Sequence, residues 1–299
     1  MFAPIIIFAY NRLVHLKQTV EALRNNIYAA ESELFIFSDG AKTETDHEKV
    51  KAVRSYLKTI TGFKNVHVIE REKNYGLANN IIDGVTLIFK EQEKVIVLED
   101  DLLTSPYFLK FMNEALDVYE HQNNVISIHG YVYPVQSTLP STFFLIDPGS
   151  LGWATWKNRW NEYEKDGKKL FQQIKAKKLE KEFNYDDTYP FTKMLKHQIQ
   201  GKNSSWVIRW YAHALLHRKL TLYPNKSLVF HNGSDGSGTH AGNSSMLDVE
   251  LTSEPVLVKP IKIEINQEAR EAFKLYFKKN NPGIGKKIIR KFKKIFFNG

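Results

Sequence analysis

Two hydrophobic periodicities alternate along residues 3–130, and this alternation constrains the fold more than any other feature of the sequence. Short apolar runs predict buried strands, whereas apolar residues spaced three or four apart predict helices. The predicted strands cover residues 5–10, 33–40, 65–70, 94–101 and 125–130, and the predicted helices cover 13–24, 46–60, 77–90 and 105–119. Because strands that alternate with helices form a mostly parallel sheet flanked by helices on both faces, the sequence predicts an α/β fold.

The second half of the chain is less regular and richer in aromatic residues and glycine. Helices are predicted there over residues 170–183, 191–200 and 206–216, followed by a short strand and a Gly/Ser/Asn-rich loop over 226–245. We expect one catalytic domain over residues 1–245, with a ligand-binding first half (1–130) and an elaborated second half (131–245). A C-terminal extension (246–282) and a tail (283–299) complete the expected organisation.

Cysteine content and charge narrow the classes of site. The chain has no cysteine, which excludes disulfides and thiolate metal sites, so a metal would need Asp, Glu, His, backbone or water ligands. The net charge is +9, and residues 286–294 contain six Lys or Arg residues and no acid. The rest of the chain is therefore near neutral. This favours a basic segment confined to the tail over a basic surface that binds nucleic acid across the whole protein.

The tail combines this basic cluster with a helical stripe of large apolar residues. The stripe consists of Ile284, Ile288, Ile289, Phe292, Ile295 and Phe296. This pattern is typical of a helix that lies in the plane of an anionic membrane surface, and a docked terminal helix is the alternative.

The apolar run at residues 2–10 is too short to span a bilayer and lacks the features of a signal peptide. We therefore expect a cytoplasmic protein, peripheral on the inner face of the membrane.

Polar residues follow four of the predicted strands, at the edge where parallel sheets bind ligands. They are Asn11-Arg12, Ser38-Asp39-Gly40, Asn74-Tyr75-Gly76 and Glu99-Asp100-Asp101. Each group alone could be an ordinary turn, but four such groups at one edge favour a binding site. The first strand is followed neither by a Gly-x-Gly-x-x-Gly motif nor by a Walker-type loop, which disfavours NAD and P-loop ATP chemistry.

The three consecutive acids are the most informative of these groups. Like charges at one strand end repel each other unless a cation is present, and carboxylate oxygens suit Mg²⁺ or Mn²⁺. Side chains alternate along a strand, so Glu99 and Asp101 should point one way and Asp100 the other. The alternative is a solvated turn or a helix cap at Asp101.

Two other strand-end residues have alternative roles. Arg12 could hold a phosphate or form a surface salt bridge. Asp39 could contact a base edge or ribose, or simply form a turn.

Several of these segments resemble the successive motifs of one enzyme family. APIIIFAYNR, IFSDGAK, NYGLANNIIDGV and VIVLEDDLLTSPYFLKFM resemble glycosyltransferases of the family 2-like kind, which have the nucleotide-diphospho-sugar transferase fold called GT-A. The EDD motif and SLGW (150–153) resemble N-acetylglucosaminyltransferase I and related bacterial polysaccharide enzymes. PNKSLVFHNGSDGSGTH (224–240) resembles the closing segment of those bacterial enzymes. The resemblance covers residues 3–240.

The resemblance implies an inverting transfer of a sugar from a nucleotide-sugar, with a UDP-sugar as the expected donor and a glycan or lipid-linked acceptor. Asp39 then takes the position that contacts uracil, Arg12 that of the diphosphate, and Asp100 that of the donor sugar. Asp101 takes the position that binds Mn²⁺ or Mg²⁺, and His240 that of a second metal or diphosphate ligand.

Glu99 and Asn79 are expected to lie with the donor-binding residues. The related enzymes have an acidic general base in the stretch that corresponds to residues 205–210, where this chain has no acid. Asp235, in a Gly-flanked loop, is the preferred candidate for the base, and Asp187 is the next.

Two other classes of function remain open at this stage. A nucleotidyltransferase that makes an NDP-sugar usually has a Gly-rich loop after its first strand, which this chain lacks. A non-catalytic sugar-binding scaffold is the other class, favoured only if the missing base means lost catalysis. Trp153, Trp156 and Trp160 could stack on an acceptor sugar or belong to the core.

Overall fold

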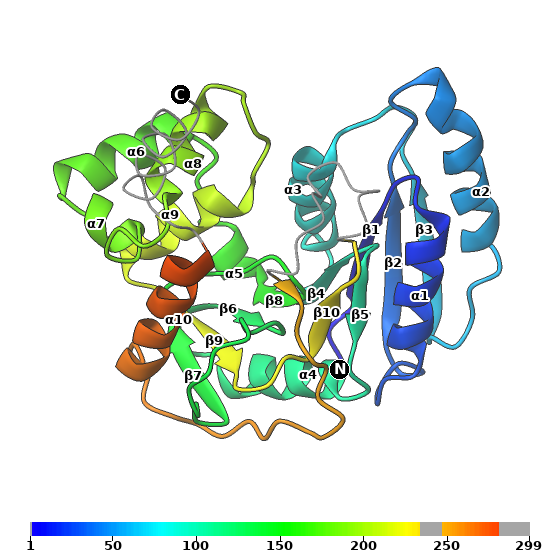
Figure 1. The fold of residues 1–299 in the computed structure, drawn as a ribbon. Helices are drawn as coiled ribbons and strands as arrows, with labels where there is room; N and C mark the ends of the chain where they lie inside the picture. Colours follow the sequence, from blue (N-terminus) through cyan, green and yellow to red (C-terminus); the bar gives the residue numbers. More distant parts are fainter. Residues whose placement is uncertain (1, 234–246, 281–299) are drawn as a thin grey trace, which may run out of the picture.

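The computed structural model describes residues 2–233 and 247–280, which form a large sheet with helices on both faces (Figure 1). The first half contains β1 (Ile5–Ala9), α1 (Leu13–Arg24), β2 (Glu33–Ser38), α2 (His47–Leu57), β3 (Asn65–Glu70), α3 (Leu77–Ile88), β4 (Lys94–Glu99), β5 (Leu102–Thr104), α4 (Phe108–Val118) and β6 (Val125–His129). A short 3₁₀ turn, Glu44–Asp46, precedes α2. The predicted elements of this half are all present, with ends that differ by a few residues.

The second half contains the predicted helices and short strand together with elements that the sequence did not predict. They follow in the order β7 (Thr142–Leu145), β8 (Trp153–Trp156), α5 (Lys157–Trp160), α6 (Gly167–Ala176), α7 (Glu180–Phe183), α8 (Phe191–Ile199), α9 (Val207–His217), β9 (Leu220–Pro224), β10 (Val229–His231) and α10 (Gln267–Asn280). The single helix predicted over residues 170–183 is interrupted, because Lys178 adopts a left-handed conformation (φ 55°) between α6 and α7.

The main sheet has eight strands in the order β3-β2-β1-β4-β8-β6-β9-β7. Strands β3, β2, β1 and β4 are parallel, as the alternation of strands and helices predicted. Strand β8 then runs antiparallel between β4 and β6 and joins the two halves of the chain in one sheet. A separate two-stranded sheet pairs β5 with β10.

Both faces of the sheet are buried, and successive residues of β1 face different layers. Ile5 and Ile7 pack with α1, α2 and α4, whereas Ile6 and Phe8 pack with α3 and the tryptophan-rich segments. Trp153 lies 4.9 Å from Trp206 and 5.6 Å from Trp160, measured between ring centroids. The tryptophans of this cluster are at most 4% exposed, so they belong to the core.

No helix in the described ranges is long and apolar enough to cross a membrane.

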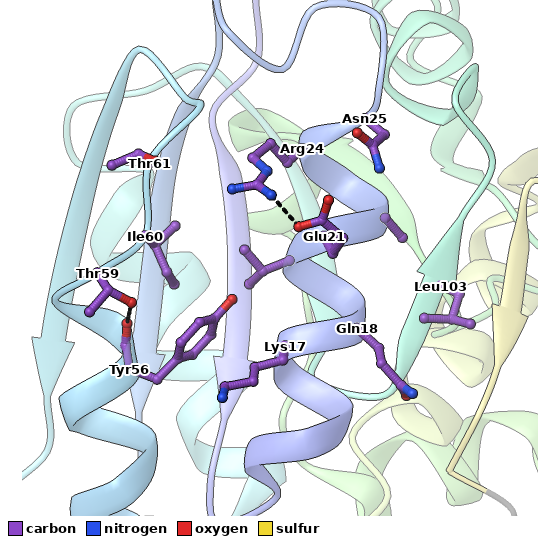
Figure 2. A pocket seen from close by; sticks show the side chains of 12 residues that line it. Lys17, Gln18, Glu21, Arg24, Asn25, Tyr56, Thr59, Ile60, Thr61 and Leu103 are labelled. Atoms are coloured by element: carbon purple, nitrogen blue, oxygen red, sulfur yellow. Dashed lines mark hydrogen bonds and ion pairs between the residues drawn. The ribbon is translucent and has the colours of Figure 1, made fainter.

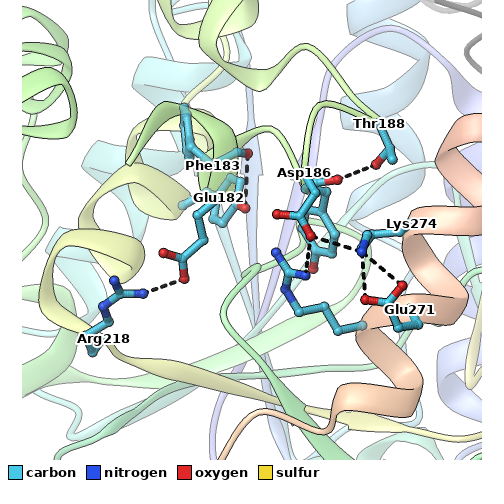
Figure 3. A network of polar contacts seen from close by, with 10 residues as sticks. Glu182, Phe183, Asp186, Thr188, Arg218, Glu271 and Lys274 are labelled. Carbon is cyan, nitrogen blue, oxygen red and sulfur yellow. Dashed lines mark hydrogen bonds and ion pairs between the residues drawn. The ribbon is translucent and has the colours of Figure 1, made fainter. Parts of the chain in front are cut away.

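Helix α10 lies within the predicted extension and is fastened to the second half by apolar and charged contacts. Phe273 and Phe277 are buried in the main core. Asp186 accepts from Arg270 at 2.8 Å and lies 3.0 Å from Lys274, as Figure 3 shows. Asp186 stands in a turn of three consecutive left-handed residues, 185–187, with φ from 48° to 65°. These ion pairs and the packed aromatic rings offset the strain of that turn.

Asp147, between β7 and β8, is a carboxyl group inside the second half. The residue is 8% exposed, and its backbone carbonyl accepts a hydrogen bond from the Tyr223 hydroxyl at 2.6 Å. Burial raises the pKa of Asp147 to about 7 from its ordinary value of 3.8. The folded protein therefore keeps a proton on Asp147 at pH values where the unfolded chain releases it.

This shift predicts a specific pH dependence of stability. Asp147 favours the folded state below its ordinary pKa, and that contribution is lost as the pH rises from about 4 to about 7. Asp147→Asn carries no titrating proton, so its melting temperature minus that of the wild type should increase over this interval. Thermal unfolding at half-unit pH steps measures the difference. A difference for Asp147→Asn that stays constant over this interval would contradict the prediction.

Candidate active site

The carboxyl ends of β2, β1 and β4 lie side by side and bring most of the predicted residues to one edge of the sheet. Strand β1 pairs with β2 on one side and with β4 on the other. Asp39 therefore follows the strand on one side of β1, and the Glu99-Asp100-Asp101 turn ends the strand on the other side. Arg12, which follows β1, lies between them and reaches the acids.

Arg12 bridges two of the three acids through one nitrogen atom. Its Nη2 lies 2.6 Å from Asp100 Oδ1 and 2.6 Å from Asp101 Oδ2. The other Asp100 oxygen accepts from the Tyr10 backbone N–H at 3.2 Å, and the Asp100 carbonyl accepts from the Thr19 hydroxyl at 2.9 Å. Residues before and within α1 thus hold the acidic turn from one side.

The three acids differ in their pKa values. Burial, with added repulsion from Asp101 and Asp100, raises the pKa of Glu99 to about 8. Burial also raises the pKa of Asp100, although Arg12 opposes this. For Asp101, burial is outweighed by the hydrogen bonds and charges of His231 and Arg12, which lower its pKa to about 2. Asp101 is therefore the acid whose surroundings most favour the ionised form.

His231 is a site residue that the sequence analysis missed. Strand β10 pairs antiparallel with β5, with His231 opposite Leu102, and this register brings His231 Nε2 to 3.2 Å from Asp101 Oδ2. The next residue, Asn232, donates its backbone N–H to the Asp101 carbonyl at 3.0 Å. A histidine that ends a short strand directly before a Gly-rich loop was the available signal. The predicted residues His240 and Asp235 lie outside the described residues.

Glycine is required where the chain passes Asp101 after β10. A Cβ atom at Gly233 would lie 2.3 Å from Asp101 Oδ2 and 3.0 Å from His231 Nε2. Backbone, imidazole and guanidinium groups therefore surround the same carboxylate oxygen.

Asp39 organises the turn that precedes α3. Its Oδ1 accepts from the backbone N–H groups of Gly40 at 2.9 Å and Tyr75 at 2.8 Å, and its Oδ2 accepts from Gly76 at 3.0 Å. The side chain of Asn74 donates to the Gly40 carbonyl at 2.8 Å. Asp39 thus has the turn-forming role that was the alternative in the sequence analysis. Among the described residues Oδ2 accepts this one bond, and a carboxylate oxygen can accept two.

Arg71 is a second residue that the sequence analysis did not select. It follows β3, and its guanidinium lies 4.5 Å from the Tyr75 ring centroid and 4.9 Å from that of Phe37. Its Nε donates to Asn80 at 3.1 Å. The predicted residue Asn79 is exposed on the first turn of α3 and donates to the Tyr75 carbonyl at 3.0 Å. This edge therefore presents a cation and an aromatic ring near Asp39.

The described part of the chain contains residues that could contribute to a metal site. Within residues 2–233 and 247–280, no group of three or more His, Asp or Glu side chains could hold a metal ion. Asp101 and His231 are a pair of suitable donors in contact with each other. A carboxylate and an imidazole fit Mn²⁺ when a ligand supplies the remaining oxygens.

A separate cleft of about 740 Å³ lies away from this edge, between α1 and the segment that follows α2 (Figure 2). Its lining includes Lys17, Gln18, Tyr56, Thr59 and Leu103. None of the strand-end acids lines this cleft, so it is distinct from the candidate active site.

A match to a family model identifies the protein family to which the chain belongs. The model described as glycosyl transferase family 2 matches residues 5–179, more than half of the chain. The chain belongs to this family. The predicted glycosyltransferase fold class and enzyme class are thus confirmed, and family membership supports a nucleotide-sugar donor for this glycosyltransferase. A search of curated proteins gave no match.

Solved structures show only a distant likeness. S. aureus TarS 1-349 is 14% identical, with a TM-score of 0.44 over 78% of this chain and 60% of that chain. TarS 1-349 in complex with UDP-GlcNAc is 17% identical, with a TM-score of 0.37 over 52% and 46%. The mannosyltransferase PcManGT from Pyrobaculum calidifontis, in complex with GDP-Man and Mn²⁺, is 14% identical, with a TM-score of 0.33 over 44% and 36%. The match thus spans less than two thirds of each of these chains, and this likeness assigns no substrate to the present glycosyltransferase.

The Asp39 turn leads to a prediction about Gly40. A Cβ atom there would lie 2.4 Å from the Lys73 carbonyl carbon, so Gly40→Ala must push residues 73–76 away from Asp39. Overpacking of this kind costs about 1–3 kcal/mol. We expect a lower melting temperature and weaker nucleotide binding, measured by thermal unfolding and calorimetry. Wild-type values for both would show that Asp39 does not depend on this close approach.

Proposed function

We propose that this protein is a metal-dependent inverting glycosyltransferase that transfers a sugar from a UDP-sugar to a glycan or lipid-linked acceptor in surface polysaccharide biosynthesis. The observation that carries the proposal is the convergence of Arg12 and His231 on Asp101 at the end of β4. A departing diphosphate requires positive charge to stabilise it. Arg12 would supply a cationic side chain, and His231 together with the ionised Asp101 would supply ligands for a metal ion.

The donor-binding roles are distributed along the sheet edge. Asp39 Oδ2 accepts one hydrogen bond from the described residues, and its second lone pair would accept the imide N–H of uracil. Arg12 would contact the diphosphate, and Asp100, which lies 2.6 Å from Arg12, would contact the donor sugar. Glu99 and Asn79 complete the proposed donor-binding set.

Asp101 and His231 are the described residues that would hold Mn²⁺ or Mg²⁺. When bound, the ion would stabilise the negative charge that develops on the leaving diphosphate. His240 remains a proposed additional ligand, on the sequence resemblance alone. Arg12 would stabilise the same charge by a bidentate contact.

Deprotonation of the acceptor hydroxyl requires a general base, because the hydroxyl attacks as its proton leaves. The start of α9, at residues 205–210, supplies no acid. Asp235 is the proposed base, supported by its position in a Gly-flanked loop of the sequence. Asp187 is the second candidate: it is exposed and held in a left-handed conformation with φ 65°.

The metal-site assignment is tested by substitution. Asp101→Asn and His231→Ala should each lower sugar transfer by roughly 10²-fold or more, because charge stabilisation of the leaving group is lost. Release of UDP from a panel of UDP-sugars, with and without Mn²⁺, measures the effect. Glu93→Gln, at an exposed position just before β4, is the matched control. Near wild-type turnover of Asp101→Asn would refute the assignment, and release of pyrophosphate from UTP and a sugar phosphate would indicate a nucleotidyltransferase instead.

We also propose that residues 283–299, which lie outside the described residues, hold the enzyme on the cytoplasmic leaflet of the membrane. The support is the sequence pattern of an apolar stripe opposite six basic residues. Each cation near an anionic surface contributes about 1 kcal/mol, and the apolar stripe adds to this by insertion.

The tail proposal predicts a double dependence of membrane binding. Co-sedimentation with vesicles that contain an anionic lipid should decrease at high salt and also on changing Phe292 and Phe296 to Ser. Both phenylalanines belong to the apolar stripe, so their loss removes insertion while the charge stays the same. Undiminished binding after deletion of residues 283–299 would assign membrane attachment to another part of the protein.

A further inference from the structure

We propose that Arg12 occupies the place of the divalent cation in the donor-free enzyme and that the donor diphosphate draws Arg12 away from Asp101. Metal and nucleotide would then bind cooperatively. Arg12 blocks the metal position in the free enzyme, and the bound nucleotide moves Arg12 out of that position. This inference rests on the proposed metal-dependent function and concerns the regulation of the same site.

The first observation is the position of the guanidinium. One nitrogen, Nη2, lies 2.6 Å from an oxygen of Asp100 and 2.6 Å from an oxygen of Asp101. The side chains of the two acids are 6% and 9% exposed, and that of Arg12 is 17% exposed. A positive group that bridges two nearly buried carboxylates neutralises the repulsion that a bound divalent cation would otherwise relieve.

The second observation is the crowding around Asp101 Oδ2. The same oxygen lies 3.2 Å from His231 Nε2, and it is so close to Gly233 that a Cβ atom there would lie at 2.3 Å. A cation that binds both Asp101 and His231 must therefore enter a position that Arg12 already contacts. The two positive charges would also repel each other strongly at this short distance in a buried site.

Arg12 cannot leave Asp101 by losing its proton. The guanidinium of an arginine side chain stays protonated in proteins. A competing anion is therefore needed to move the side chain. Diphosphate suits this purpose because guanidinium binds phosphate oxygens in a bidentate manner.

The geometry shows how the exchange can occur without loss of the whole contact. Within the described part of the chain, the hydrogen bonds of Arg12 to the acids use Nη2 alone, so Nη1 and Nε are available to a phosphate. Arg12 also stands at the residue before α1, with φ −110° and ψ 75°, outside the helical backbone. The proposed exchange turns the side chain from Asp101 toward the ligand and keeps its contact with Asp100.

The inference predicts that removing Arg12 improves metal binding to the free enzyme. Arg12→Met should bind Mn²⁺ at least about tenfold more tightly than the wild type in the absence of nucleotide, a difference of about 1.4 kcal/mol. The measurement is the free Mn²⁺ signal in electron paramagnetic resonance, which does not depend on catalysis. Melting temperatures provide a second readout: without metal the variant should melt lower than the wild type, and Mn²⁺ should stabilise it more.

The matched control is Arg24→Met, at the other end of α1. Arg24 pairs with Glu21 on the exposed side of the helix and does not contact the strand-end acids. Its loss should leave Mn²⁺ binding unchanged. Arg12→Gln, which can still donate a hydrogen bond to either carboxylate, is the second neutral variant and serves if Arg12→Met does not fold.

A complete series measures Mn²⁺ binding with and without UDP. In the wild type, UDP should increase Mn²⁺ affinity, and by linkage Mn²⁺ should increase UDP affinity by the same factor. In the Arg12 variants this factor should decrease because free-enzyme affinity for Mn²⁺ has increased. If the wild type binds Mn²⁺ with UDP but the variants bind it no more tightly without nucleotide, Arg12 is no substitute cation and the proposed function stands. If no form binds Mn²⁺ with or without UDP, metal dependence and this inference both fail.

Discussion

Electrostatic repulsion among three consecutive acids at the end of β4 is the constraint on which the site depends. Glu99 ends the strand, and Asp100 and Asp101, which follow it, are 5% and 6% exposed, so water screens the charges of these two acids only weakly. The fold supplies compensating groups from two directions. Arg12 comes from the neighbouring parallel strand, and His231 comes from the late strand β10. The contacts of Arg12 and His231 thus hold the Asp101 carboxylate in place in the folded chain.

The antiparallel strand β8 explains why the second half of the chain reaches this site. Val97 of β4 pairs with Trp153 of β8, so the residues just before β8 lie beyond the end of β4. Gly152 adopts φ 65° and accepts from the Gly130 N–H at 2.7 Å. The Leu151 N–H donates to His129 Nε2 at 3.2 Å. The register and these hydrogen bonds therefore fix the segment 150–153 near the end of β4.

Asp39 positions the backbone at the start of α3. Its carboxylate accepts three backbone N–H groups and thereby fixes the start of α3. Charge-assisted hydrogen bonds of this kind are stronger than neutral ones, so the turn is rigid before nucleotide binds. The same rigidity orients Tyr75 against Arg71, whose guanidinium lies 4.5 Å from the ring centroid. Asp39 in this way shapes the chain around the start of α3.

The parallel core and the location of the acidic turn could be predicted from the sequence, because both depend on local patterns. Strands β1 to β4 and the helices between them have five or more residues, enough for a hydrophobic period to be read. Strands β7, β8 and β10 have three or four residues and show no such period, so β8 and its antiparallel direction were missed. Only the tertiary structure decided which charges meet. Arg12 lies 89 positions from Asp101, and His231 lies 130 positions from it, so their contacts follow from strand order and register rather than from any local pattern.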